Sequence, residues 1–467
     1  MRAMGYAAGV LMSLAAVPIL IRHLGIAEFG RYTTVIALVA IVAGVTEGGL
    51  NAIVQREYAT QEGERRAQLM RQLLGMRVVV TSVGVGSALV FGLAAGYDDV
   101  LVLGTLAAGA GLLLASLQGL FSSVMQAELR FGWPTVVDLV RQALTAGMII
   151  VLALAGASLL PFLAIPIAAG AVGIALIVPL VRGHMPLRPA FKVGQWGGIL
   201  RDTLPYAAAT ALNAAYFRIA VIVMSIQATE LQTGYYATAF RVVEVLVAIP
   251  VLAIGAAFPI LARAARDDES RFDYATQRVL ELGLIAGTWV VLCLALGAQV
   301  AIDVLADDAQ PAVAVLRIQG LALVATFVAL AAAFPLLALR RHGVILLANG
   351  LALVAAVGLT LALVPGLEAR GAALAITLAE LISAAVMVGA LLRVRPAVAT
   401  VVRCVPAVLL AAGAGALVGL LPKVPATIDV ILGSAVFFVV LALMGRFPPE
   451  IRDALRRAPQ RATLADR

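Results

Sequence analysis

The sequence predicts an all-α integral membrane protein with about fourteen transmembrane helices, arranged as two pseudo-symmetric six-helix lobes plus two extra C-terminal helices. Three observations support this prediction. Hydrophobic residues make up 62% of the 467 residues and charged residues only 13%, about half the charged share of a soluble domain. Apolar stretches of membrane-spanning length recur along the whole chain. Arginines gather in every second connection between these stretches.

The apolar segments can be placed in order, and each is long enough to cross a hydrocarbon core of about 30 Å. The first begins at Met4, and the next follows too closely for a cleaved signal peptide with a soluble body, so we interpret it as a retained helix. The predicted helices cover residues 4–22, 31–54, 73–95, 100–124, 136–156, 159–181, 203–227, 233–262, 278–299, 313–337, 344–365, 369–392, 402–421 and 427–445.

The basic side chains fix the predicted topology. The connection after the second helix carries Arg56, Arg65, Arg66, Arg71 and Arg77, and further sets of basic residues follow the sixth, eighth, tenth, twelfth and fourteenth helices. The opposite connections hold few basic residues and include the acidic pair Asp98–Asp99. Because cytoplasmic loops concentrate Lys and Arg, this alternation predicts that both termini are cytoplasmic. The arginines of the cytoplasmic connections also account for the net charge of +8, so we expect no nucleic-acid partner.

An internal repeat divides the predicted helices. The motif Gly30-Arg31-Tyr32 precedes the second helix, and Gly234-Tyr235-Tyr236 precedes the eighth, 204 residues later. The same offset relates the predicted starts of later helices, which suggests parallel repeats with a binding site between them. We therefore predict five segments: an N-lobe at 1–181, a cytoplasmic linker at 182–202, a C-lobe at 203–392, two extra helices at 393–446, and a basic cytoplasmic tail at 447–467.

Ionisable residues inside the spans are the candidate site, because a charge costs about 2.5 kcal/mol or more at the centre of a bilayer. Arg218 lies well inside the seventh helix, and Arg241 and Glu244 share one face of the eighth. Arginine can grip a phosphate with two parallel hydrogen bonds, so these residues are candidates for binding an anionic substrate. The alternative for Arg241 and Glu244 is an internal ion pair that fixes helix packing.

Four further ionisable residues complete the candidate set. Glu47, beside two glycines, and Glu380, in the twelfth helix, could carry a coupling proton or serve only as structural carboxylates. Arg22 and Arg317 lie near the outer ends of their helices, where they could contact substrate or anchor the helix at the interface. The sequence contains no metal-ligand, nucleophile or nucleotide-binding signature. We therefore expect no cofactor, no metal and no enzymatic activity.

Several motifs resemble those of a known family. The stretch from Pro18 to Tyr32, with its Arg22-His-Leu-Gly25 and Glu28-Phe-Gly-Arg-Tyr32 elements, resembles the opening signature of polysaccharide flippases. These belong to the multidrug/oligosaccharidyl-lipid/polysaccharide exporter superfamily. The segments Gly234–Glu244, Phe258–Arg263 and Arg370–Ala375 are also similar to family motifs.

The resemblance implies an alternating-access flippase that moves a polyprenyl-pyrophosphate-linked oligosaccharide to the periplasmic leaflet for surface polysaccharide synthesis. The implied partners are this anionic lipid-linked oligosaccharide, the membrane lipids and a polysaccharide polymerase complex. A flippase for the peptidoglycan precursor lipid II is the closest alternative. A membrane glycosyltransferase or a non-transporting assembly component is less favoured, because no loop exceeds about twenty residues.

Overall fold

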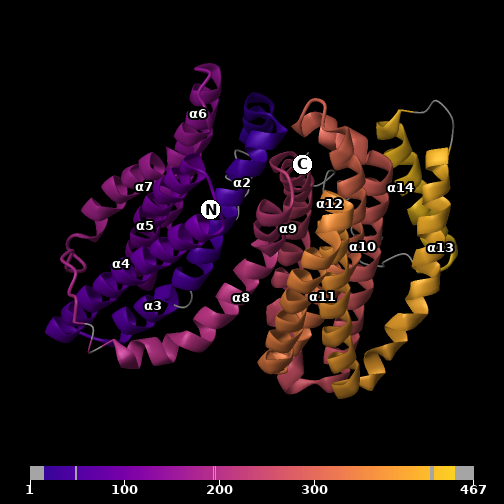
Figure 1. Ribbon diagram of the computed structural model, residues 1–467. Helices are drawn as coiled ribbons and strands as arrows, with labels where there is room; N and C mark the ends of the chain where they lie inside the picture. The colour runs from indigo at the N-terminus through magenta and orange to yellow at the C-terminus, as the bar shows by residue number, and fades with distance from the viewer. Residues whose placement is uncertain (1–14, 48–49, 193, 195, 421–424, 447–467) are drawn as a thin grey trace, which may run out of the picture. The chain divides into compact units, whose positions relative to one another are not determined.

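The structure, a computed structural model, describes residues 15–47, 50–192, 194, 196–420 and 425–446. Within this part of the chain all regular elements are helices (Figure 1). After a short helix at Ala15–Leu24, the elements are α2 (Ile26–Glu47), α3 (Leu50–Thr60), α4 (Gly63–Ala94), α5 (Asp99–Ala127), α6 (Gly132–Leu154), α7 (Leu159–Val181), α8 (Gly197–Gln227), α9 (Glu230–Asp267), α10 (Glu269–Leu305), α11 (Gln310–Ala338), α12 (His342–Val394), the 3-10 helix η2 (Pro396–Cys404), α13 (Val405–Ala416), the 3-10 helix η3 (Leu417–Leu420) and α14 (Ala426–Leu443).

The predicted number of spans is confirmed. Twelve described helical segments are long and apolar enough to cross a membrane, and Ala15–Leu24 is a shorter apolar helix. The 53-residue α12 would be about 80 Å long as one straight helix. It instead holds two helices that meet at Glu368, where φ is 50° and ψ is −129°. Counting α12 twice and adding Ala15–Leu24 gives fourteen, with the α12 junction between the predicted helices 344–365 and 369–392.

The structure corrects the predicted inner connection after the second helix. Helical structure continues beyond the predicted end at residue 54, because α3 runs from Leu50 to Thr60. Arg56 therefore lies in α3, and Arg71 and Arg77 lie within α4, not in a loop. Other predicted segments fall outside the described residues: the start of the first helix, the pair Gly48–Gly49 and the basic tail at 447–467.

The contacts group the chain into two compact units. Unit 1 holds the chain up to Thr238 together with residues 305–307 and 356–369, and unit 2 holds the rest. Unit 1 thus includes α8 and the first turns of α9. This grouping reflects contacts and leaves the predicted lobe boundaries, which rest on the repeat, as a prediction.

Small residues bring the helices of unit 1 together. A side chain at Gly44 of α2 would collide with Ala214 of α8, and the Thr210 hydroxyl of α8 donates to the Gly44 carbonyl at 3.1 Å. Gly170 of α7 similarly receives Leu114 of α5. In a membrane, helices associate through such close packing because lipid removes the hydrophobic drive between them.

The two C-terminal helices belong to unit 2, where they pack on α10 (Figure 1). Leu292 and Leu296 of α10 fill the space left by Gly415 of α13 and Gly433 of α14. The indole of Trp289 donates to the Ser434 hydroxyl of α14 at 2.9 Å. The C-terminal pair is therefore a packed addition to this unit.

Candidate functional site

The candidate residues predicted from the sequence lie on helices of both units. Arg218 is half-buried on α8. On α9, Arg241 donates to Glu244 at 2.5 Å, which confirms that this pair can satisfy itself. Both side chains of the pair are about one-third exposed, so the pair is accessible as well as internally neutralised.

The remaining candidates differ in burial. Arg22 is exposed and lies 3.6 Å from Asp307. Arg317 of α11 and Glu47 at the end of α2 are exposed, whereas Glu380 of α12 is only 7% exposed. A role in substrate binding or ion coupling stays a prediction for each of the seven residues.

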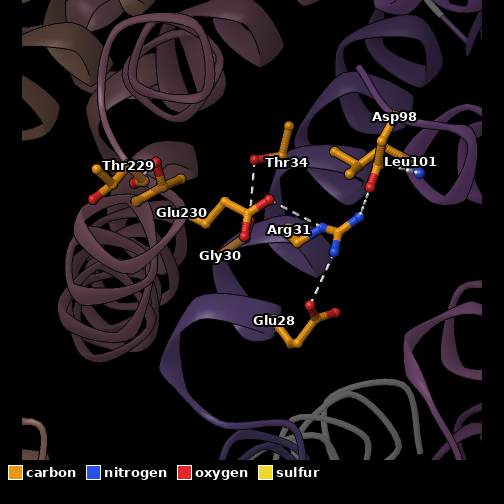
Figure 2. Close-up of polar contacts among 9 residues, drawn as sticks. Glu28, Gly30, Arg31, Thr34, Asp98, Leu101, Thr229 and Glu230 are labelled. Atoms are coloured by element: carbon orange, nitrogen blue, oxygen red, sulfur yellow. Dashed lines mark hydrogen bonds and ion pairs between the residues drawn. The ribbon is translucent and has the colours of Figure 1, made fainter.

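A cluster of ion pairs centred on Arg31 joins three helix starts (Figure 2). Its guanidinium lies 3.0 Å from Glu28 of the same helix, 3.3 Å from Glu230 at the start of α9, and in hydrogen-bond contact with Asp98. The Arg31 side chain is only 14% exposed, while its three carboxylate partners are 38–58% exposed. One largely covered cation thus faces three accessible anions, a set we call the Arg31 cluster.

Local sequence places each member of the Arg31 cluster. Glu28 and Arg31 are three residues apart on α2, so they share a helix face. Gly96, with φ of 76°, turns the chain after α4, and Asp98 then caps α5 by accepting a bond from the Leu101 amide at 3.0 Å. Glu230 is the first residue of α9. The members of the cluster therefore lie at or near the first turns of α2, α5 and α9.

Two glycines allow α2 and α9 to touch beside the cluster. A Cβ on Gly30 would lie 2.7 Å from the amide nitrogen of Gly234, and one on Gly234 would lie 2.7 Å from the carbonyl carbon of Ile26. These are the glycines of the two G-x-Y motifs found 204 residues apart. The repeated motif therefore marks a point where two backbones are in direct contact.

A cavity of about 220 Å³ adjoins the Arg31 cluster. Its lining is polar: Arg31, Glu230 and Asp98 contribute charges, and Thr34, Ser225 and Thr233 contribute hydroxyls. The hydroxyls of Tyr97 and Ser225 are 2.6 Å apart at its edge. Burial raises the pKa of Tyr97, which keeps the phenol protonated.

A second arginine, Arg77, is completely buried within unit 1. Its guanidinium donates to the carbonyls of Thr46 at 2.9 Å and Ser116 at 3.2 Å, and to the side-chain oxygen of Asn51 at 3.2 Å. Thr46 lies in α2, Asn51 in α3 and Ser116 in α5, so Arg77 of α4 links three other helical segments. The Glu47 carboxylate also attracts this guanidinium.

Sequence reasoning counted both arginines among the loop charges, although they fall near the starts of the predicted helices 31–54 and 73–95. A signal for Arg77 was present, since it is followed by three valines inside the predicted helix 73–95. A signal for Arg31 was its position inside the repeated glycine motif. Apart from Glu28, the partners of both arginines come from distant parts of the chain, and no local pattern identifies them.

Comparisons with known proteins add to this geometry. Residues 19–309 match the sequence family described as polysaccharide biosynthesis protein. No curated protein matches the chain by sequence.

Solved structures share the fold at low sequence identity. The chain is similar to the lipid II flippase MurJ in an inward closed conformation, with a TM-score of 0.77 at 11% identity, covering 95% of this chain and 98% of that one. It is also similar to an inward-facing multidrug resistance MATE family transporter of the MOP superfamily, with a TM-score of 0.59 at 14% identity and coverage of 86% and 96%. A MOP superfamily transporter from Pyrococcus furiosus gives a TM-score of 0.54 at 15% identity, with coverage of 85% and 94%.

Proposed function

We propose that this chain, which belongs to the polysaccharide biosynthesis protein family, is a flippase that moves a polyprenyl-pyrophosphate-linked oligosaccharide from the cytoplasmic to the periplasmic leaflet. The observation that carries the proposal is the family match over more than half of the chain, residues 19–309. A many-helix membrane body is suited to moving a lipid-linked head group, because the polar group needs a protein path while its tail stays in lipid.

The proposed setting is the bacterial inner membrane, with both termini in the cytoplasm. The basis is the arginine asymmetry of the sequence, which follows the charge rule for cytoplasmic loops. This orientation puts the Arg31 cluster at the periplasmic side and the junction of α2 with α3 towards the cytoplasm. A polysaccharide polymerase is a proposed partner, because a flipped repeat unit must next be joined to others.

The proposed binding residue for the pyrophosphate is Arg218 on α8, and Arg241 and Glu244 on α9 are further candidates for substrate binding. Arg218 lies in the interior of a span, where a guanidinium needs anionic or polar company. A pyrophosphate supplies paired oxygens that match the guanidinium fork. Glu47 and Glu380 are the proposed carboxylates for coupling to an ion gradient.

A lipid II flippase is the alternative function. The chain shares its fold with MurJ, but at 11% identity this similarity does not identify the substrate of this chain. Deleting the gene separates the two functions. We expect loss of surface polysaccharide and accumulation of its lipid-linked unit in growing cells, whereas accumulation of lipid II with cell lysis would overturn the proposal.

Complementation of the deletion strain tests the binding site. Arg218→Ala should lower surface polysaccharide at least about tenfold, since a charge-assisted bond is worth about 1.5–3 kcal/mol, while membrane levels on immunoblots stay normal. Arg218→Lys should restore part of the output, because lysine keeps the charge without the fork. Arg266→Ala, at a side chain 77% exposed, is the matched control and should leave output unchanged. Normal output from Arg218→Ala would refute the proposed cationic site.

A further inference from the structure

We propose that the Arg31 cluster is a separable latch that closes the polar cavity beside it, and that transport requires the latch to open. Three contacts define the latch. Two belong to the Arg31 cluster, Arg31 with Asp98 and Arg31 with Glu230, and the third is the neighbouring hydroxyl pair of Tyr97 and Ser225. Together they tie the starts of α5 and α9 and the end of α8 around α2. The inference rests on the proposed transport function only in requiring a path that opens.

The composition of the cluster suits reversible closure. Exposed ion pairs are individually weak, usually below about 1 kcal/mol. The carboxylates of Asp98 and Glu230 are 51% and 58% exposed, so water can solvate them as soon as they separate from Arg31. Arg31 also keeps Glu28, three residues away on its own helix, as a partner when the other two leave. Opening therefore strands no charge in an apolar environment.

The glycine contact beside the cluster also permits separation. At Gly30 and Gly234 the backbones of α2 and α9 meet without side chains between them. Interlocked side chains would have to change rotamer before two helices could part. Two flat backbone surfaces can part directly, and their tight approach closes the gap when they return. The ion pairs then supply an attraction that holds this contact shut.

The cavity gives a place to measure opening. Thr34 lines the cavity and is 2% exposed, and its hydroxyl donates to the Gly30 carbonyl at 3.0 Å. A cysteine is close to threonine in size, so Thr34→Cys introduces a thiol that a reagent reaches only when the latch opens. Cys293 and Cys404 are first replaced by alanine, which removes both native thiols.

The experiment measures the rate at which Thr34→Cys reacts with two membrane-impermeant methanethiosulfonates of opposite charge, applied to right-side-out membrane vesicles. We expect Arg31→Ala to raise both rates about tenfold, the effect of losing two or three weak ion pairs. Glu230→Gln and Asp98→Asn should raise both rates about threefold, and asparagine retains the cap of α5. Arg266→Ala is the control and should change neither rate.

The two reagents distinguish opening from a simple change of local charge. Opening accelerates the cationic and the anionic reagent together, whereas a change of potential accelerates one and slows the other. Opposite shifts, or unchanged rates in all three variants, would overturn the latch. No glycan substrate enters the assay, so its result is independent of the proposed substrate.

Discussion

Arg31 and Arg77 belong to the same compact unit, yet their guanidinium groups lie in opposite surroundings. Arg31 faces three carboxylates that are partly open to solvent. Arg77 is completely buried and donates to two carbonyls and an amide oxygen. Arg31 pairs with three carboxylates, whereas the hydrogen bonds of Arg77 go to neutral acceptors. The first arrangement suits contacts that are made and broken, and the second suits a permanent joint.

The difference follows from the cost of releasing each group. Removing Arg31 from its partners returns carboxylates to water, where they are well solvated. Removing Arg77 would take a donor from each of three acceptors inside the unit, and a buried acceptor that loses its partner costs about 1–3 kcal/mol. The comparison therefore predicts that substitutions of Arg77 lower the free energy of unfolding more than substitutions of Arg31. For the rate of thiol labelling in the cavity, it predicts the larger effect at Arg31.

The largest effect is expected for Arg77→Met. Methionine approximately fills the space but donates none of the three hydrogen bonds, so the free energy of unfolding should fall by about 3 kcal/mol. Thermal unfolding in detergent, followed by tryptophan fluorescence, measures the change. Arg77→Lys should recover less than half of the loss, because one ammonium cannot reach acceptors on α2, α3 and α5 together. A stability equal to that of the parent protein would show that the joint is dispensable.

The next largest effect is expected where α2 and α9 touch. Gly234→Ala introduces a methyl group 2.7 Å from the Ile26 carbonyl carbon, so the two backbones must move apart, at a cost of about 1–3 kcal/mol. Gly350→Ala is a matched control inside α12, because nothing lies within 4 Å of its added methyl group. It should be neutral or stabilising by up to about 1 kcal/mol, since alanine favours helix. Equal melting temperatures for the two variants would contradict the close backbone contact.

A smaller stability effect is expected for Arg31→Ala. Its pairs are partly exposed, so the free energy of unfolding should change by no more than about 1 kcal/mol. Raising the salt concentration from 0.1 to 1 M should reduce the difference from the parent protein, because the screening length falls from about 10 to 3 Å. The same variant should have a large effect on thiol labelling in the cavity. A destabilisation as large as that of Arg77→Met would make Arg31 a structural joint and remove the contrast.

The sequence predicted the frame because spanning length and charge alternation are local signals. Each of the predicted spans needs only about twenty apolar residues, and the α12 junction fell between two predicted helices. The surroundings of Arg77 could not be predicted in the same way. A charged residue near the end of an apolar stretch can face water or be buried, and its burial depends on Thr46 and Ser116, which are 31 and 39 residues away.

The Arg31 cluster was partly visible in the sequence. The spacing of Glu28 and Arg31, the acidic pair at Asp98 and the repeated glycine motif were all present. The approach of Glu230 to Arg31 could not be predicted from the sequence, because it depends on the contact between Gly30 and Gly234. The repeat indicated that these glycines were equivalent, but equivalence in sequence does not predict contact.

Tyr58 of α3 provides an intermediate case between the two arginines. It is 5% exposed, and its hydroxyl donates to Glu128 at 2.7 Å. Burial, reinforced by this hydrogen bond, raises the pKa of Tyr58 to about 12. The folded protein therefore favours the protonated phenol more than the unfolded chain does, where the pKa is about 10. Its stabilising contribution is fully present below pH 10 and is lost as the pH rises toward 12.

Tyr58→Phe should therefore have the smallest effect, and one that depends on pH. We expect the free energy of unfolding to fall by about 1 kcal/mol between pH 7 and 9, the typical worth of a hydrogen bond of this kind. From pH 10 upward the parent protein and the variant should converge, because the phenol of Tyr58 ionises first in the unfolded chain and this stabilises the unfolded state. Melting curves of both proteins at each pH measure the difference. A difference that is constant up to pH 11.5 would mean that packing of the ring, and not the hydrogen bond, accounts for the contribution of Tyr58.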